Sequence, residues 1–170
     1  MTKILTGFPP IATSSATILI LGSMPSAESL RQHQYYAHKR NAFWRIMAAM
    51  FGFDAELSYR ERARRLKDHD IALWDVIKTC ERPGSLDTKI KNTSIEINDF
   101  ATFFRKHPHI RKICFNGSMA EQQFRKHVMP ILSQNQSVDI DMIRLPSTSP
   151  AMASLNFDKK LAAWSKAISR

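Results

Sequence analysis

Residues 17–26 read Thr-Ile-Leu-Ile-Leu-Gly-Ser-Met-Pro-Ser, a short apolar run that ends at Gly22 and passes into a polar turn. A continuous apolar run of this length predicts a strand that is buried on both faces of a sheet. The connection up to residue 40 is longer than the roughly two to six residues that usually follow such a strand. Because it is rich in tyrosine, histidine and basic residues, it predicts either a binding surface or an insertion packed by its own tyrosines. Asn41 then predicts the N-cap of a helix.

Further apolar runs predict three more strands, with helical patterns between them. These runs lie at residues 71–77, 110–116 and 138–145. A last helix is expected over residues 157–169, whereas residues 1–16 are expected to be irregular and residues 78–87 to be a loop. The alternation of strands and helices predicts an α/β fold. We expect one domain over residues 1–170, with three αβα layers and a mostly parallel sheet of about four strands.

The composition limits the classes of partner and compartment. The formal net charge is +10 and the pI is near 10.0, which favours an anionic partner, with nucleic acid first and an acidic membrane surface second. The sequence contains no long apolar segment and no secretory signal pattern, so we expect no membrane span and a cytoplasmic location, at nucleoid DNA in a bacterium or archaeon. Cys80 and Cys114 are expected to be reduced thiols, and no metal or other cofactor is expected.

The predicted strand ends carry most of the residues with chemical potential. They comprise residues 22–25, Asp75 with the long loop that follows it, residues 116–118 and residues 145–150. Because ligands bind at the carboxyl ends of parallel strands, these groups should surround one cleft. Their hydroxyl and N–H groups are suited to phosphate oxygens. The sequence lacks the G-x-G-x-x-G, P-loop and G-x-S-x-G patterns, which disfavours dinucleotide, nucleoside-triphosphate and serine-hydrolase sites. The pattern therefore favours a protein that grips nucleic acid and takes one base into a pocket.

Three segments, Gly-Ser-Met-Pro-Ser at 22–26, Tyr-Ala-His-Lys-Arg-Asn-Ala-Phe-Trp at 36–44 and Leu-Pro-Ser-Thr-Ser-Pro-Ala at 145–151, resemble motifs of the uracil-DNA glycosylase superfamily. Within it they are most similar to the hypoxanthine-DNA (deoxyinosine) glycosylase branch. The resemblance extends over nearly the full chain. It implies a monofunctional DNA glycosylase of base excision repair, acting without a cofactor on DNA that contains deaminated bases. We expect a monomer.

The resemblance also implies roles for individual residues. Met24 occupies the position where the uracil and mismatch-specific branches keep an Asp or Asn that positions the attacking water, and Leu145 occupies that of a histidine that stabilises the departing base. Both departures agree with the hypoxanthine branch, in which the asparagine of the Asn-x-Phe-Trp segment is implicated in catalysis. That residue is Asn41.

The remaining implied contacts fall into two groups. Tyr36 would stack on the extruded base, and Asp75 would read its edge, with a paired structural aspartate as an equal alternative for Asp75. The predicted base-binding residues are Tyr36, Asp75, Gly22, Ser23 and Met24. The predicted DNA-binding residues are Ser26, His38, Ser147, Thr148 and Ser149. His38 has the alternative of capping its own loop, and Asn116 is expected to be a turn residue.

Cleavage of an N-glycosidic bond passes through an oxocarbenium-like sugar, and hypoxanthine disperses the negative charge of the leaving base through its lactam. Positioning and electrostatics can therefore lower the barrier without a strong nucleophile, once the base has been flipped out of the duplex. Three alternatives stay open: a non-catalytic nucleic-acid-binding domain on the same fold, a uracil-preferring glycosylase, and a small-molecule hydrolase or transferase. The basic charge argues against the last of these.

Overall fold

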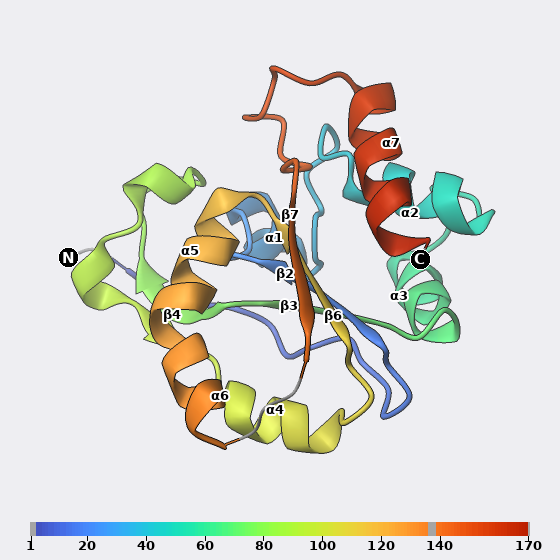
Figure 1. Cartoon of the computed structure of the whole chain (residues 1–170). Coiled ribbons are helices and arrows are strands. Elements are labelled where there is room, and N and C mark those ends of the chain that lie inside the picture. Colours follow the sequence, from blue (N-terminus) through green and yellow to red (C-terminus); the bar gives the residue numbers. More distant parts are fainter. Residues whose placement is uncertain (1–2, 136–138, 170) are drawn as a thin grey trace.

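Four parallel strands form the centre of the computed structural model, which describes residues 3–135 and 139–169. Their order is β3-β2-β6-β7 (Figure 1). The strands are β2 (Ile18–Gly22), β3 (Ile71–Asp75), β6 (Lys112–Asn116) and β7 (Asp141–Leu145). The register pairs Gly22 with Asp75 and Asn116 with Leu145, so the carboxyl ends of all four strands lie along one edge of the sheet. This alignment brings the predicted site segments together.

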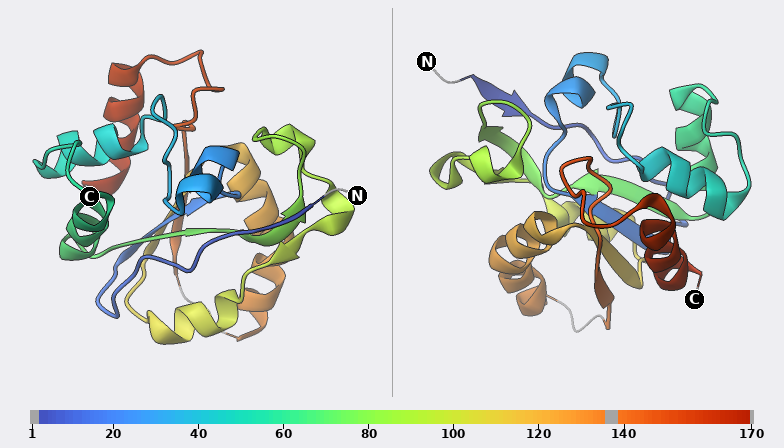
Figure 2. Two further views of the ribbon diagram at one scale, coloured as in Figure 1. Left: turned by 180° about the vertical axis from the view of Figure 1, so that it is seen from behind. Right: turned by 90° about the horizontal axis from the view of Figure 1, so that it is seen from above.

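Helices cover both faces of this sheet and complete three layers, as predicted. One layer contains α2 (Phe43–Phe51), α3 (Tyr59–Asp68) and α7 (Phe157–Ile168), and the other contains α4 (Phe100–Lys106), α5 (Ser118–His127) and α6 (Met129–Asn135) (Figures 1 and 2). β3 is buried along its whole length, which explains its continuous apolar run. On the first face Phe43 of α2 packs edge-to-face on Trp164 of α7, with ring centroids 6.0 Å apart. Each fully buried side chain of this size contributes roughly 1.5–3 kcal/mol.

A smaller antiparallel sheet lies beside the main one and corrects two expectations. Within the same described residues its order is β1-β4-β5, formed by β1 (Ile4–Thr6), β4 (Ile77–Glu81) and β5 (Glu96–Ile97). Residues 1–16 are therefore not wholly irregular, and residues 78–81 belong to a strand instead of a loop. β1 is only three residues long and largely exposed, so it has no apolar period. β4 exposes Lys78 while it buries Ile77 and Cys80, and this pattern is too short to stand out.

Two predicted boundaries also change. The helix expected to start at Asn41 has Ala42 as its N-cap and begins at Phe43, although the Asn41 Oδ1 still accepts a hydrogen bond from the Phe43 N–H at 2.9 Å. The fourth strand was expected from Val138, which lies outside the described residues, and β7 covers Asp141–Leu145 as an edge strand. α1 (Ala27–Gln32) forms the helical turn that follows the first motif. In the described part of the chain, no helix is long and apolar enough to cross a membrane.

Candidate functional site

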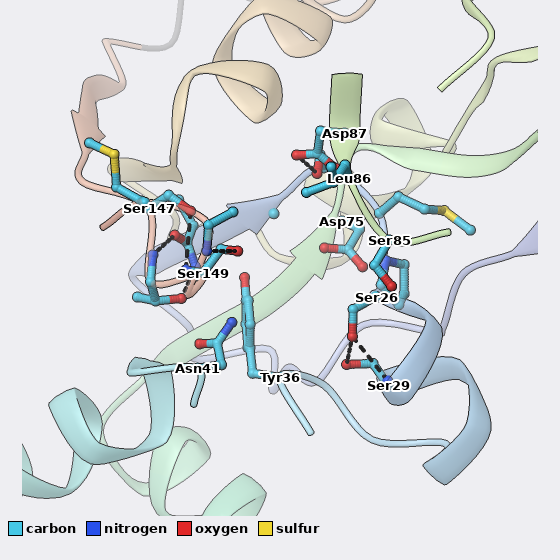
Figure 3. A pocket seen from close by; sticks show the side chains of 18 of the residues that line it. Ser26, Ser29, Tyr36, Asn41, Asp75, Ser85, Leu86, Asp87, Ser147 and Ser149 are labelled. Carbon is cyan, nitrogen blue, oxygen red and sulfur yellow. Dashed lines mark hydrogen bonds between the residues drawn. The ribbon is translucent and has the colours of Figure 1, made fainter. Parts of the chain in front are cut away.

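A cavity of about 460 Å³ opens where the four strands of the main sheet end (Figure 3). Every residue predicted for catalysis, base binding or DNA binding lines this cavity, with the exception of His38. The His38 Nδ1 accepts a hydrogen bond from the Arg40 N–H at 3.2 Å, and the His38 carbonyl accepts one from the Asn41 N–H at 2.8 Å. His38 therefore holds its own loop in shape, and its contact with DNA stays a prediction.

The floor of the cavity carries two buried polar atoms that lack a hydrogen-bond partner within the described residues: Asp75 Oδ2 and Tyr36 Oη. Asp75 is only 3% exposed and has no ion-pair partner in this part of the chain, which disfavours the alternative of a paired structural aspartate. Leaving a buried polar group unpaired costs about 1–3 kcal/mol. Figure 3 shows both side chains directed into the cavity, where a ligand would satisfy them.

Burial changes the protonation of the floor. It raises the pKa of Asp75 to about 8, and the negative charge of Asp87 adds to the increase, whereas the charge of Arg82 opposes it. Burial also raises the pKa of the Tyr36 phenol, and the charge of Asp75 adds to this effect, whereas the nearby side chain of Asn116 opposes it. At neutral pH both groups are therefore mainly protonated. A carboxylic acid of this kind donates from one oxygen and accepts at the other.

Tyr36 adopts a left-handed backbone conformation, with φ = 54°. A bulky residue held in this region costs of order 1–3 kcal/mol, and such strain is concentrated at functional sites. The Tyr36 ring stacks on Phe43, with centroids 4.1 Å apart and an interplanar angle of 25°. The strained turn thus directs the Tyr36 ring toward the cavity, and the stacked Phe43 ring fixes its orientation. Stacking of the ring on a base stays a prediction.

Asn41 stands beside Tyr36 at the cavity wall (Figure 3). Its Oδ1 is oriented by the Phe43 N–H, which also fixes the position of the Nδ2 amide. That amide has no hydrogen-bond partner among the residues that the structure describes. Asn41 therefore presents a positioned donor that is available to a ligand or a water molecule.

Asn116, which was expected to be a turn residue, holds the motif at residues 145–151 in place through two hydrogen bonds. Its Nδ2 donates to Thr148 Oγ1 and its Oδ1 accepts from the Thr148 N–H, both at 2.9 Å. The Thr148 carbonyl in turn accepts from the Ala42 N–H at 3.0 Å. Gly117, with φ = +93°, leaves the space for Ser147, whose Cβ would lie 3.1 Å from a Cβ at Gly117. The segment that contains Asn41 and the last motif therefore form one connected wall.

The opposite wall comes from residues 82–88, in the loop after Asp75 that was expected at the cleft, although no residue of this loop was predicted as a site residue. We call these residues the strap, because three hydrogen bonds hold them on the first motif and α1. The bonds run from Ser23 Oγ to Asp87 Oδ2 (2.7 Å), from Arg82 Nη2 to the Pro25 carbonyl (2.5 Å) and from the Ala27 N–H to Ser85 Oγ (2.9 Å). Leu86 lies at the cavity rim and is 51% exposed. An Arg-Pro-Gly turn signal was visible in the sequence, but it does not say where a loop folds back.

The described residues contain no group of three His, Cys, Asp or Glu side chains that could hold a metal ion. Cys80 and Cys114 are buried free thiols away from the cavity. The chemistry that the site offers is therefore hydrogen bonding from a protonated carboxyl, a phenol and an amide, next to hydroxyl and N–H groups at the rim.

Comparison with known proteins gives a consistent result. A model of the uracil DNA glycosylase superfamily matches residues 9–168. A hypoxanthine DNA glycosylase of Methanosarcina barkeri is 44% identical over 112 residues, which cover 65% of this chain and 70% of the relative. One of Methanosarcina acetivorans is 44% identical over 115 residues, which cover 67% and 72%. A solution NMR structure of a candidate uracil DNA glycosylase from Methanosarcina acetivorans aligns with a TM-score of 0.77 and 35% identity, covering 99% of this chain and 100% of that one.

Proposed function

Because the chain belongs to the uracil-DNA glycosylase superfamily, we propose that it is a monofunctional DNA glycosylase that excises hypoxanthine from DNA. The two relatives named hypoxanthine DNA glycosylase support this substrate. The observation that carries the proposal is the cavity floor, where Asp75 Oδ2 and Tyr36 Oη are buried without a partner in the described chain. Such a floor is suited to a base that brings its own donor and acceptor.

Hypoxanthine presents a carbonyl oxygen next to an N–H group, as every lactam does. The protonated Asp75 carboxyl can donate to that oxygen and accept from that N–H, so the two groups pair through two hydrogen bonds. An ionised carboxylate would repel the oxygen, and the raised pKa of Asp75 prevents this at neutral pH. Uracil and xanthine share the lactam, so the shape of the cavity must decide between these bases.

The reaction follows from this arrangement. The enzyme flips the nucleotide out of the duplex, at a lower cost for a weak inosine pair. As the N-glycosidic bond breaks, its electron pair moves onto the base, water adds to the sugar carbon, and the proton that this water loses ends on the base. The Asp75 O–H stabilises the charge that reaches the lactam oxygen. Asn41 orients the water or hydrogen-bonds the base, a role that Met24 cannot fill. Tyr36 holds the base by stacking.

DNA is the partner of this enzyme, and the net charge of +10 suits it. Hydroxyl and N–H groups of the rim bind the phosphates around the flipped nucleotide, with Ser26, Ser147 and Ser149 as the proposed contacts. We further propose that the protein acts as a monomer and in the cytoplasm, at nucleoid DNA in a bacterium or archaeon.

The test is a panel of duplexes that each carry one hypoxanthine, uracil, xanthine or adenine, incubated with excess enzyme. We expect free hypoxanthine to be released, and the product strand to break only after treatment with alkali. Salt-sensitive DNA binding without release of any base would instead identify a non-catalytic binding domain. Hydrolysis of free nucleosides with little salt dependence would identify a small-molecule hydrolase.

A further inference from the structure

Lys160, in the first turns of α7, is a buried cation without a carboxylate partner in the described chain. It is 5% exposed, and its Nζ donates to the Ser149 carbonyl at 3.3 Å. Taking an ammonium group out of water is costly unless another charge compensates it. Burial accordingly lowers the pKa of Lys160. Ser149 lines the cavity but Lys160 does not, so its charge lies behind the wall of the site.

Three carbonyl groups of the turn in front of Lys160 are bonded to donors in the protein interior, and the Ser149 carbonyl also accepts from the Met152 N–H at 3.0 Å. The three bonds to interior donors run from Trp164 Nε1 to the Pro146 carbonyl (3.0 Å), from the Ala42 N–H to the Thr148 carbonyl (3.0 Å) and from Lys160 Nζ to the Ser149 carbonyl (3.3 Å). Carbonyl oxygens repel a phosphate. Because these carbonyl groups point inward, the outer side of the turn presents N–H and hydroxyl groups, which can bind a phosphate.

Those donors have only weak internal bonds. The Ser149 N–H donates to Ser147 Oγ, and the Ala151 N–H donates to Ser149 Oγ, each at 3.2 Å. Both bonds lie within the turn and can be exchanged for bonds to an anion at little cost. Ser147 and Ser149 lie together on one wall of the cavity (Figure 3).

We propose that Lys160 is a positioning residue for DNA, which holds the Ser149 carbonyl inward and places a positive charge behind the phosphate that Ser147 and Ser149 bind. The inference rests on the proposed DNA glycosylase function. The bound phosphate supplies the negative charge that the folded protein alone does not give to Lys160. The cost of burying the ammonium is therefore offset in the complex with DNA.

The test compares Lys160→Gln, Lys160→Met and Lys160→Arg with the wild-type protein, and uses Lys166→Gln as a control for net charge. Lys166 lies on the same helix and is exposed. The probe is a labelled duplex with a tetrahydrofuran analogue of an abasic site, which the enzyme cannot hydrolyse. Its dissociation constant is measured over a range of salt concentrations, and thermal unfolding of each variant is followed in parallel.

Lys160→Gln keeps a donor for the Ser149 carbonyl but has no charge, so we expect it and Lys160→Met to bind about tenfold more weakly. In both variants the plot of log K against log salt should become less steep, by an amount that corresponds to the loss of up to about one phosphate contact. Lys160→Arg should bind like the wild type, as should Lys166→Gln. The unfolding temperature of the Gln and Met variants should be unchanged or higher, because a neutral side chain is easier to bury.

Wild-type affinity and slope in Lys160→Gln and Lys160→Met would overturn the inference and leave Lys160 a packing residue. An equal loss in the Gln and Arg variants would also overturn it, because charge would not be the cause. If Lys160→Arg does not fold, the inference is still tested by comparing the DNA affinity of Lys160→Gln and Lys160→Met with that of Lys166→Gln. Excision of hypoxanthine is measured separately: a protein that binds the abasic duplex but releases no base would refute only the glycosylase function.

Discussion

The carboxyl group of Asp75 lies over Gly22, its register partner at the end of the neighbouring strand, in the space that a side chain at Gly22 would occupy. A Cβ at Gly22 would overlap Asp75 Oδ1 and would lie 2.9 Å from Tyr36 Oη. The backbone of Gly22 does not have a positive φ, so space, and not conformation, requires glycine. The absence of a side chain at Gly22 thus leaves room for the Asp75 carboxyl and the Tyr36 hydroxyl on the floor of the cavity.

Gly22→Ala should therefore disturb the site more than the fold. We expect a loss of about 1–3 kcal/mol in the free energy of unfolding, because one methyl group is forced into a packed region. Excision of hypoxanthine should fall about 100-fold, since displacements near 1 Å at a reacting centre have effects of this size. Urea unfolding and single-turnover excision measure the two effects.

A double-mutant cycle tests whether Asp75 is the group that the methyl group meets. Asp75→Ala vacates the space, so the double variant should lose less stability than the sum of the two single losses, by more than about 0.5 kcal/mol. Strictly additive losses would show that Gly22 and Asp75 do not compete for the same space.

The stability of the protein should depend on pH through Asp75. Burial raises its pKa from 3.8 to about 8. Between these values the folded state binds more protons than the unfolded state, so stability falls as pH rises through this window and levels off above it. The fall amounts to at most about 6 kcal/mol at the alkaline end. Asp75→Asn cannot ionise and should lack it. Urea unfolding of both proteins over the window measures the difference, and parallel curves would contradict the raised pKa.

Excision should follow the same titration. The wild-type rate should fall above about pH 8, because ionised Asp75 has lost the O–H that donates to the lactam oxygen. Asp75→Asn keeps an N–H donor, so its lower rate should lack this alkaline fall. Single-turnover rates over the pH range, with DNA saturating, provide the measurement. An alkaline limb of the same shape in the Asn variant would assign the titration to another group.

Tyr36→Phe should separate stability from function. The Tyr36 hydroxyl is buried without a partner in the described chain, so its removal should leave the free energy of unfolding unchanged or raise it by up to about 1 kcal/mol. Excision should nevertheless fall about tenfold, because the bound nucleotide loses a hydrogen bond while stacking of the ring on the base is retained. A variant that is more stable and fully active would mean that the hydroxyl does not contact the bound nucleotide.

The sequence was sufficient for the main sheet because its signals are local. Apolar runs that break at Gly22 and Gly117 define two strand ends, and parallel pairing then places the strand ends along one edge. The second run was expected to continue to residue 77, whereas β3 ends at Asp75. The cavity and most of its lining follow from this alone. The family motifs added the functional interpretation of Tyr36 and Asn41, which the pattern left open between binding and packing.

The loop after Asp75 was expected at the cleft, but the bonds that hold the strap could not be predicted, because they join residues that are far apart in sequence. Ser23 and Asp87 are 64 positions apart, and Pro25 and Arg82 are 57 apart. A polar loop with an Arg-Pro-Gly turn has the same composition whether it extends into solvent or folds onto a site. Asn116 was misjudged for a similar reason, since its two bonds to Thr148 span 32 positions.

Asn41→Ala should test the proposed catalytic residue. Excision should fall about 100-fold, the size of the effect of losing one positioned donor. Stability should fall by about 1 kcal/mol, because the Phe43 N–H loses its side-chain acceptor. Ser58→Ala removes a comparable cap from α3, outside the cavity, and should lose similar stability with no loss of excision. Equal rates in Asn41→Ala and the wild type would remove Asn41 from the mechanism.

Arg82 should control how firmly the strap closes the cavity. Its side chain is fully buried, yet its nearest carboxylate oxygen, on Asp87, is 4.0 Å away. Its guanidinium donates hydrogen bonds to the carbonyl groups of Pro25 and Gly84, so it links the backbone of the first motif to the backbone of the strap. Arg82→Met should cost about 2–4 kcal/mol, and amide exchange of residues 84–88 should accelerate.

Because Arg82 does not line the cavity, its loss should weaken binding of the inosine duplex more than it slows the chemical step at saturating DNA. Arg105→Met, on the exposed surface of α4, removes the same charge and is the control. If amide exchange in the strap stayed slow while binding weakened, the effect of Arg82 would be electrostatic. Faster exchange with unchanged binding would mean that the strap encloses the cavity without contributing to recognition of the base.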